Sequence, residues 1–450
     1  MPERISLADA ESPGSACSVE HAGPASPSTH GASPLSQRTA TVAAEARSAP
    51  PRFPFPPGPL GGEPREYAER RAQCPFGRVT MRDGNEAILA LRYADVSAAL
   101  DDPRFSRVPT TPESPRWTRA GNIFTDPVSF VNQEGEDHLR QRRVLASALS
   151  AGQIDSWRPM IEQSAHELLE DLARAGHEAD LMAGFFTTYP VLVMCRLLGI
   201  PPEDYDRRWS DAHMSATPLT DEQRNTALDE FGDYIVELIA RKRREAATGH
   251  AEHEQHSEIT GRLIGALDEG VLSEEEAVYI LLSVIAVGTE TVTNTFSRIV
   301  LMLLLDDRAM WDQVAAAGEI SRPVVDELLR RFQQGNGAML RIAREDIDLP
   351  SGLVRAGEIV ALPLSSAHLD ESAFPDPYAL RFDRNGPKAL VFGGGAHYCL
   401  GVNLAKTELQ IGLTALMRAF PDLHLAVEPR RLRYSKGELL TVIRKFPVAW

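Results

Sequence analysis

The feature that most constrains the fold is a long, almost uninterrupted apolar segment from Ala277 to Leu305. It follows Ser273-Glu274-Glu275-Glu276, in which the serine can cap a helix and the last glutamate can bond back to the cap. As a helix, the segment would be roughly 45 Å long, enough to cross a whole domain. This length also fits a membrane span. Three polar side chains inside the segment would be costly in lipid, however, and favour a buried helix of a soluble protein: Glu290, Asn294 and Arg298.

The middle of this predicted helix contains the unusual run Val287-Gly288-Thr289-Glu290-Thr291. Gly288 removes a side chain at a point where another group would approach closely. A threonine hydroxyl can bond to the carbonyl four residues back and bend the helix. A glycine kink with a self-satisfied threonine would explain part of this pattern without any chemistry.

A second unusual segment lies near the C-terminus and reads Phe392-Gly393-Gly394-Gly395-Ala396-His397-Tyr398-Cys399-Leu400-Gly401. Three consecutive glycines allow backbone geometry closed to other residues, so the main chain can lie against a flat ligand. The pattern turns helical from Leu400, which places Cys399 where a helix begins. Because a helix N-terminus favours anions, we expect a lowered thiol pKa and a thiolate, the form that binds metals.

Two familiar kinds of binding site match this glycine-rich segment less well. A dinucleotide-binding G-x-G-x-x-G run would need a third glycine where Tyr398 stands. A zinc site usually brings C-x-x-C or comparable spacing, but the four cysteines are scattered: Cys17, Cys74, Cys195 and Cys399. If the segment stood alone, a glycine-rich turn with a buried, inert cysteine would account for it without any ligand.

The segment resembles the haem-binding loop of the cytochrome P-450 family, Phe-x-x-Gly-x-x-x-Cys-x-Gly. All fixed positions are matched, by Phe392, Gly395, Cys399 and Gly401. The resemblance implies that Cys399 binds the iron of haem b, and that three further loop residues contact the cofactor: Phe392, Gly393 and His397, the last standing where the family has a basic residue. It also implies the family's fold, which is mainly α with small β-sheets in a single large domain.

Further motifs occur in the family's order. The run ending in Glu290-Thr291 resembles its oxygen-binding groove, which implies that Thr291 holds dioxygen and that Glu290 helps to deliver protons. His138 and Arg142 fall one turn apart on a helix expected from Glu134. Alone they would be ordinary surface residues, but they match the family's His-x-x-x-Arg helix, which implies that they bind the haem propionates. Arg341 is implied as another propionate ligand.

A structural motif of the family follows. Glu327 and Arg330 match its buried Glu-x-x-Arg pair, which is completed by an arginine from a later proline-rich segment, and we assign that role to Arg381. One departure is Ala367-His368-Leu369-Asp370, where Ala-Asn-Arg-Asp is common among bacterial relatives. Loss of that arginine affects local contacts rather than haem binding.

The rest of the chain divides at about residue 50. Residues 1–50 are rich in Ala, Ser and Pro and predict a disordered extension, and 51–450 form the haem domain. Short apolar runs around Asp83-Gly84 predict a β-hairpin over 79–89, and a helix is expected over 95–100. Residues 107–131 predict a long functional or mobile loop. Helices over 153–248 break at 199–202 and 217–218. Histidines between 250 and 256 could bind a metal, although a polar surface loop explains them better.

The net charge and the cysteines indicate which ligands the protein does not bind and in which compartment it works. A formal net charge of −16 over 450 residues argues against generic binding to nucleic acid or anionic membranes. The N-terminal residues show no basic segment followed by an apolar one, so no signal peptide is expected. Few, scattered cysteines fit a reducing compartment. These features predict a cytoplasmic protein.

The resemblance implies a bacterial-type monooxygenase that inserts one atom of O2 into a medium-sized, largely hydrophobic organic substrate, an intermediate of secondary metabolism. The chain has no flavin or iron–sulfur motif, so a ferredoxin and a ferredoxin reductase would supply its electrons. Two alternatives remain. One is an enzyme of the same fold that performs oxidative coupling, epoxidation or peroxide-driven chemistry. The other is a non-catalytic haem-binding protein, against which the retention of Glu290 and Thr291 counts.

Overall fold

The computed structural model describes residues 49–107, 128–214, 219–247, 259–305, 308–316, 318–333, 337–435 and 441–450. Several sequence predictions concern residues outside these ranges. They are the extension over 1–50, most of the loop over 107–131, the break at 217–218 and the histidines between 250 and 256.

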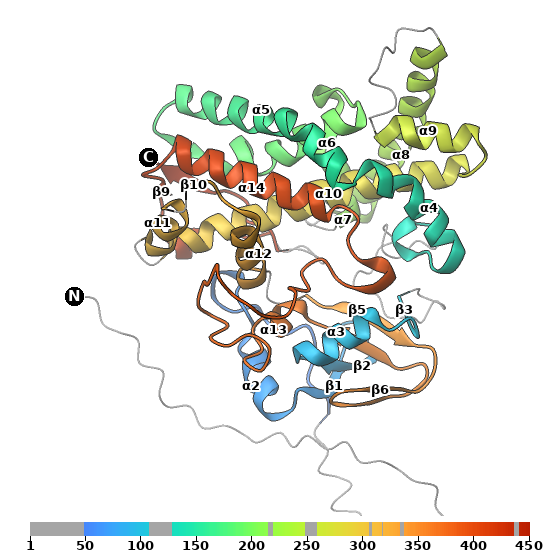
Figure 1. The fold of residues 1–450 in the computed structure, drawn as a ribbon, viewed down its shortest axis with the longest axis vertical. Coiled ribbons are helices and arrows are strands. Elements are labelled where there is room, and N and C mark those ends of the chain that lie inside the picture. The colour runs from blue at the N-terminus through green and yellow to red at the C-terminus, as the bar shows by residue number, and fades with distance from the viewer. Residues whose placement is uncertain are drawn as a thin grey trace, which may run out of the picture.

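Helices make up most of the structure (Figure 1), which confirms a mainly α fold with small β-sheets in a single domain. The helices are α2 (Arg65–Gln73), α3 (Tyr93–Asp101), α4 (Gly135–Ala148), α5 (Ala151–Ala175), α6 (Thr188–Leu198), α7 (Arg207–Met214), α8 (Asp221–Ala247), α9 (Ile259–Asp268), α10 (Glu274–Leu304), α11 (Ala309–Ala315), α12 (Arg322–Arg331), α13 (Leu364–His368) and α14 (Val402–Ala419). The break at 199–202 is also confirmed, because α6 ends before Gly199, which has φ of 66°.

The strands form three small sheets. A five-stranded sheet has the order β1-β2-β8-β5-β3, a three-stranded sheet the order β4-β10-β9, and β6 pairs with β7 alone. Their bounds are β1 (Phe76–Thr80), β2 (Glu86–Ala90), β3 (Phe105–Ser106), β4 (Glu178–Asp180), β5 (Met339–Ala343), β6 (Ile347–Leu349), β7 (Gly352–Val354), β8 (Ile359–Leu362), β9 (His424–Leu425) and β10 (Pro447–Ala449). β1 and β2 pair antiparallel around Gly84, as the Asp-Gly signal predicts.

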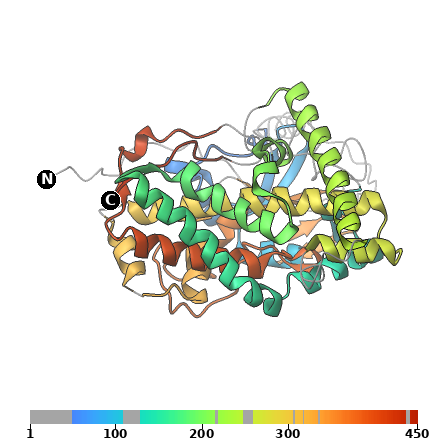
Figure 2. The same cartoon turned by 90° about the horizontal axis from the view of Figure 1, so that it is seen from above.

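The long helix α10 runs through the middle of the helical part, with other helices on both sides (Figure 2). Its first turn carries the predicted capping box between Ser273 and Glu276. By length and composition it could cross a membrane, but 61% of its most apolar 18-residue window is buried inside the protein. The expected buried central helix is confirmed.

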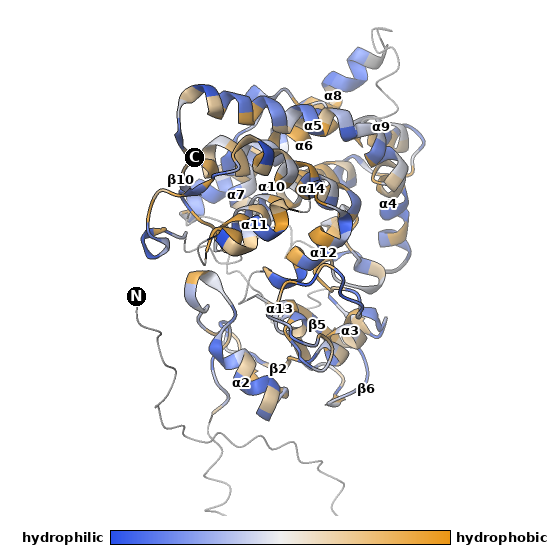
Figure 3. Ribbon diagram, turned by 60° about the vertical axis from the view of Figure 1, so that its left-hand side comes forward, coloured by the Kyte–Doolittle hydropathy of each residue, from blue (hydrophilic) through white to orange (hydrophobic). Residues whose placement is uncertain are grey.

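Buried apolar residues cluster among the helices and against the five-stranded sheet, and hydrophobic residues occur along the elements of both parts (Figure 3). The sheet, α2, α3 and α13 lie on one side of the molecule, and the long helices lie on the other (Figure 1). The loop that precedes α14 lies between these two parts. Residues from both can therefore reach this loop.

Candidate active site

Cys399 lies in the loop that leads into α14. Its N–H donates to the carbonyl of Phe392 at 2.9 Å, and the N–H of Gly393 donates to Leu390 at 2.8 Å, so the loop folds back on itself. Gly393 has φ of 74° and Gly395 has φ of 61°, both in the left-handed region that glycine tolerates best. These bonds fix the point at which the cysteine is presented.

The same loop presses against α3. A Cβ atom on Gly395 would lie 2.5 Å from the carbonyl oxygen of Leu100, a distance that real side chains do not reach. The N–H of Gly395 also donates to the Asp101 carboxylate at 2.8 Å. Glycine is therefore required here for packing against α3 as well as for the backbone conformation.

The thiol of Cys399 is not acidified by the protein alone. Burial raises its pKa, and the Gly401 N–H and the Arg142 guanidinium, which both lower it, do not offset burial. The helix itself begins only at Val402, with Gly401 as its cap. The expected lowering of the pKa by the helix N-terminus is thus wrong. A coordinated metal cation would deprotonate this thiol directly.

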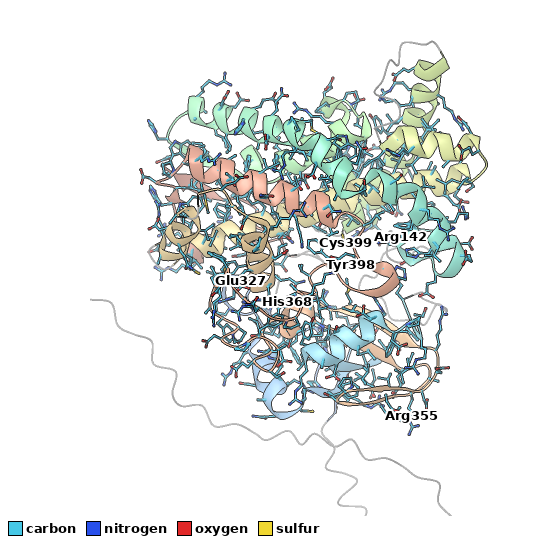
Figure 4. The ribbon with its side chains drawn as sticks, in the orientation of Figure 1. Arg142, Glu327, Arg355, His368, Tyr398 and Cys399 are labelled. Carbon is cyan, nitrogen blue, oxygen red and sulfur yellow. The ribbon has the colours of Figure 1, made fainter. Side chains whose placement is uncertain are left out.

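Arg142 joins α4 to the cysteine loop. Its Nη2 donates to the carbonyl of Tyr398 at 2.7 Å, and Figure 4 shows Arg142 beside Tyr398 and Cys399. One turn earlier on α4, the ring of His138 lies 4.5 Å from that of His397, between centroids, and stacks on Phe130 at 5.2 Å. Two residues predicted on α4 and two predicted in the loop are therefore neighbours.

Two further arginines belong to this group. Arg341 on β5 is only 6% exposed, and its Nη1 donates to the adjacent carbonyl of Leu340 at 2.9 Å. Arg107 follows β3 and was not predicted from the sequence. Burial, together with the charge of Arg341, lowers the pKa of Arg107 to about 9, and burial lowers that of Arg341 to about 10. Both shifts indicate positive charge held with too little compensation.

One carboxylate faces these basic groups. Among the residues that the structure describes, Glu134 is the only acid that acts on Arg107, His138 and Arg341. It already accepts the N–H of Arg107 at 2.9 Å and pairs with Arg344. Burial is the main cause that lowers the pKa of His138 to about 4 and that of His397 to about 2, so both rings are neutral donors. These three guanidinium groups and two imidazoles, of which Glu134 acts on only three, fit the two propionates of a haem beside Cys399.

The middle of α10 presents one accessible face. Five residues at helical spacing are partly exposed in an otherwise buried stretch: Val284, Val287, Gly288, Thr291 and Thr295. The hydroxyl of Thr291 donates to the carbonyl of Val287 at 2.7 Å, as the sequence predicts. A Cβ atom on Gly288 would lie 3.1 Å from the Met194 sulfur, so the expected close approach is made by α6.

Glu290 points elsewhere and is 1% exposed. Burial raises its pKa to about 7, although Arg207 of α7 opposes this change. The Arg207 Nε lies 3.9 Å from the Glu290 Oε1 and 3.7 Å from the Asp211 Oδ1. Among the described residues, neither Glu290 nor Thr291 hydrogen-bonds to the cysteine loop. A carboxyl group of this pKa can take up and release a proton at neutral pH.

The structural motif is present, but its third member is not Arg381. Glu327 and Arg330 form two buried bonds of 2.7 and 2.9 Å. Arg384 donates its Nε to Glu327 at 3.1 Å. The Arg381 side chain is 50% exposed, its Nε lies 3.8 Å from Asp383, and only its backbone N–H reaches Glu327. The chain turns after Arg381, as the bond from Arg384 N to Arg381 O shows, and this turn directs the later arginine inward.

His368 connects this motif to the cysteine loop. It is fully buried, and its Nε2 accepts the N–H of Leu390 at 2.7 Å. Its carbonyl accepts from Arg330 at 2.8 Å, and Figure 4 shows it below Glu327. Burial lowers the pKa of His368 to about 3, which keeps this nitrogen available as an acceptor. The departure from the common Ala-Asn-Arg-Asp run therefore still provides a contact that orients the loop.

Four residues with roles here were not predicted from the sequence: Arg107, Arg207, His368 and Arg384. The first two reach the site across long sequence separations, and no local pattern marks them. His368 stands in a segment that departs from the common bacterial run. Arg384 lies three residues from Arg381, so a broader search of that segment would have included it.

Comparisons with known proteins agree with this geometry. The family model described as cytochrome P-450 matches residues 319–445. Mycinamicin IV hydroxylase/epoxidase of Micromonospora griseorubida is 35% identical over 85% of this chain and 94% of that protein. Nocardicin C N-oxygenase of Nocardia uniformis subsp. tsuyamanensis is 34% identical over the same shares.

Solved structures give the same result. The crystal structure of the LnmA cytochrome P-450 hydroxylase of Streptomyces atroolivaceus has a TM-score of 0.78 and 33% identity, covering 89% of this chain and all of that one. With the cysteine loop and its basic surroundings, these similarities identify the chain as a member of the cytochrome P-450 family, a haem-thiolate monooxygenase that binds haem b.

Proposed function

We propose that Cys399 is the thiolate ligand of the haem iron, and that the enzyme oxygenates a medium-sized, largely apolar intermediate of bacterial secondary metabolism. The observation that supports this most is the convergence of Arg107, Arg142 and Arg341 on the cysteine loop, where one carboxylate, that of Glu134, acts on Arg107 and Arg341. Haem, when bound, supplies the activation of O2, so that substrate, O2, two electrons and two protons give hydroxylated product and water.

Different residues of the chain would then hold different parts of the haem. Arg107, Arg142 and Arg341 would bind propionate oxygens, and the rings of His138 and His397 would donate to the same groups. The backbone of Gly393 and the ring of Phe392 would contact the macrocycle. In this arrangement Cys399 is held by the bond from its own N–H to Phe392, and Gly401 donates to its sulfur, which adjusts the electron donation by the thiolate.

Proton delivery is assigned to α10. The Thr291 hydroxyl donates to Val287 and keeps its lone pairs free to accept from water or from a second donor. Glu290, with a pKa of about 7, exchanges protons with solvent on the side of α7. Removing either group is expected to slow product formation more than it weakens substrate binding.

The relatives support the substrate class. Their names give activities on mycinamicin IV, in Micromonospora griseorubida, and on nocardicin C, in Nocardia uniformis. By analogy, the substrate of this chain is a comparable organic intermediate. The sequence similarity supports hydroxylation or a related oxygen insertion.

We also infer that a ferredoxin, reduced by its reductase, docks beside the cysteine loop in the cytoplasm. Lys388 lies 3.8 Å from the ring of Tyr398, and Lys406 lies 5.4 Å from that of Phe392. Both cations border a surface cavity of about 240 Å³. Because Lys406 is paired with Asp326 at 2.6 Å, Lys388 is the one that suits an acidic protein partner. The test is product formation coupled to NADPH consumption, which should require both the ferredoxin and the reductase.

The thiolate assignment is tested by optical spectra of the dithionite-reduced protein under carbon monoxide. Wild type should give the strongly red-shifted Soret band of a thiolate trans to carbon monoxide, and Cys399→Ser should not. Cys195→Ser is the matched control, because Cys195 is also a free cysteine, and burial raises its pKa to about 12. A red-shifted band that survives in Cys399→Ser would refute the assignment.

A further inference from the structure

A cavity of about 390 Å³ lies between the start of α2, the C-terminal half of α10 and the end of α12. No residue of the cysteine loop lines it. Its size is within the range of small-molecule sites in proteins. Its walls combine apolar groups, such as Met302 and Leu369, with several charged ones.

Arg298 is a buried cation on this wall. It is 8% exposed and lies two turns after Thr291 on α10. Its Nε donates to the carbonyl of Gln333 at 3.2 Å, and its Nη1 donates to that of Leu60 at 2.9 Å. Both partners are neutral, and in the part of the chain that the structure describes no carboxylate pairs with it. Burial lowers its pKa to about 10.

Arg331 adds a second guanidinium to the same cavity. Its Nε donates to the carbonyl of Tyr378 at 2.6 Å, and its Cζ lies 5.4 Å from the centre of the Tyr378 ring. Burial lowers its pKa, and the charge of the neighbouring Arg330 acts in the same direction. Arg331 also lowers the pKa of Arg298, so the two charges act on each other.

The carboxylates of the cavity are already occupied. Glu63 pairs with Arg71 and accepts from the Tyr378 hydroxyl at 2.9 Å. Glu69 pairs with Arg65 at 2.6 Å. Beside these pairs, the Oε1 of Gln333 is buried and has no hydrogen-bond partner among the described residues. The cavity thus keeps the Arg298 guanidinium, which has no carboxylate partner among the described residues, and one amide oxygen without a hydrogen-bond partner there. It also keeps the Arg331 guanidinium, on which Glu63 and Glu327 act without offsetting the effect of burial.

We propose that this cavity is a second ligand site, which binds a small organic carboxylate between Arg298 and Arg331. A carboxylate matches the planar fork of a guanidinium, and the apolar walls would accept its hydrocarbon part. The ligand would link the segment before α2 to α10 and α12. This site is separate from the proposed oxygenation site and does not depend on its assignment.

The test measures binding to the haem-loaded protein by isothermal calorimetry. Phenylacetate is the probe, phenylacetamide is its neutral counterpart, and inorganic phosphate is a second anion without an apolar part. We expect saturable phenylacetate binding with a Kd below about 1 mM. Phenylacetamide should not bind, and the Soret band should not change, because no residue of the cysteine loop lines the cavity. Saturation should also raise the Tm by about 1–3 °C.

Variants locate the binding. Arg331→Gln should weaken it by about tenfold or more, since a hydrogen bond to a charged group is worth about 1.5–3 kcal/mol. Arg298→Lys should weaken phenylacetate binding by a similar factor. Because Arg298 also donates to two backbone carbonyls, Arg298→Lys could fold poorly, and Arg331→Gln is then the decisive variant. Arg65→Gln is the control on the rim, because its side chain is 79% exposed and paired with Glu69.

Three results would overturn the proposal. They are the absence of saturable phenylacetate binding, equal affinity in wild type and Arg331→Gln, and a Soret change that follows the binding curve. Phosphate binding that is lost in Arg331→Gln, with no phenylacetate binding, would also reject an organic carboxylate as the ligand.

Discussion

The acidity of Glu290 should depend on Arg207, which reaches it from α7. The Arg207 Nε lies 3.9 Å from the Glu290 Oε1. The Glu290 side chain is 1% exposed and the Arg207 side chain is 39% exposed. Unit charges at about 4 Å attract by about 1 kcal/mol in water and about 4 kcal/mol at an effective dielectric constant near 20. Because Arg207 is more than a third exposed, solvent screens it, and we expect about 1–2 kcal/mol.

Replacing Arg207 by Gln removes a charge that holds the pKa of Glu290 down. The pKa is about 7 in the intact protein, with burial as the main cause. A loss of about 1.4 kcal/mol moves such a midpoint upward by about one pH unit. If protonated Glu290 supplies protons for the reaction, the rate falls as pH rises through this pKa. In Arg207→Gln, that fall should occur about one pH unit higher.

The assay is the rate of product formation from neutral to mildly alkaline pH, with substrate and ferredoxin saturating. Arg207→Lys keeps the charge and should keep the wild-type midpoint. Arg208→Gln is the control on the same helix, because Arg208 is 58% exposed and pairs with Asp206 and Glu230 instead. A midpoint that is unchanged in Arg207→Gln, or that moves equally in Arg208→Gln, would refute the reasoning.

Three further predictions concern stability and the cysteine loop. Burial raises the pKa of Glu290 from 4.5 to about 7, so the native state keeps a proton that the unfolded state releases. This stabilisation is fully present below the pKa of Glu290 in the unfolded chain, and it is lost as pH rises through about 7. The Tm of Glu290→Gln relative to that of wild type should therefore increase between pH 5 and 8. The increase should be equivalent to about 3 kcal/mol in the free energy of unfolding. Arg384→Ala should lower the free energy of unfolding by about 3–5 kcal/mol, and Arg381→Ala by less than about 1 kcal/mol, in urea titrations; equal losses would contradict the assignment of Arg384 as the third member of the motif. Gly395→Ala should reduce the haem content of purified protein. Gly84→Ala, at φ of 92° but with no atom within 4 Å of the added Cβ, should cost only the backbone strain and keep its haem.

Elements with strong local signals were predictable from the sequence. The capping box at Ser273 determines the start of α10, and the apolar length of this helix determines its burial. The Asp83-Gly84 turn determines the register of β1 and β2. In each case the residues that carry the signal also make the structure, through bonds that span a few positions.

The direction of side chains in irregular segments was not predictable in the same way. Arg381 and Arg384 lie in one proline-rich stretch without helix or strand period, so spacing does not tell which side chain turns inward. The prediction for the thiol of Cys399 failed for a related reason. The effect of burial depends on everything packed around the sulfur, and it exceeds the helix-terminus effect that the local sequence shows.

The basic cluster shows why its members could not be found one by one. Arg107 follows a two-residue strand, Arg142 lies on α4 and Arg341 on β5, and each looks ordinary in its own segment. Together they form a group of positive charges that opposes folding unless an anion joins it, because Glu134 compensates only part of the charge. An uncompensated group of this kind persists where a ligand supplies the missing charge. The feature of this chain that most requires an anionic cofactor is therefore the shortage of acid around Arg107, Arg142 and Arg341, which only the folded structure reveals.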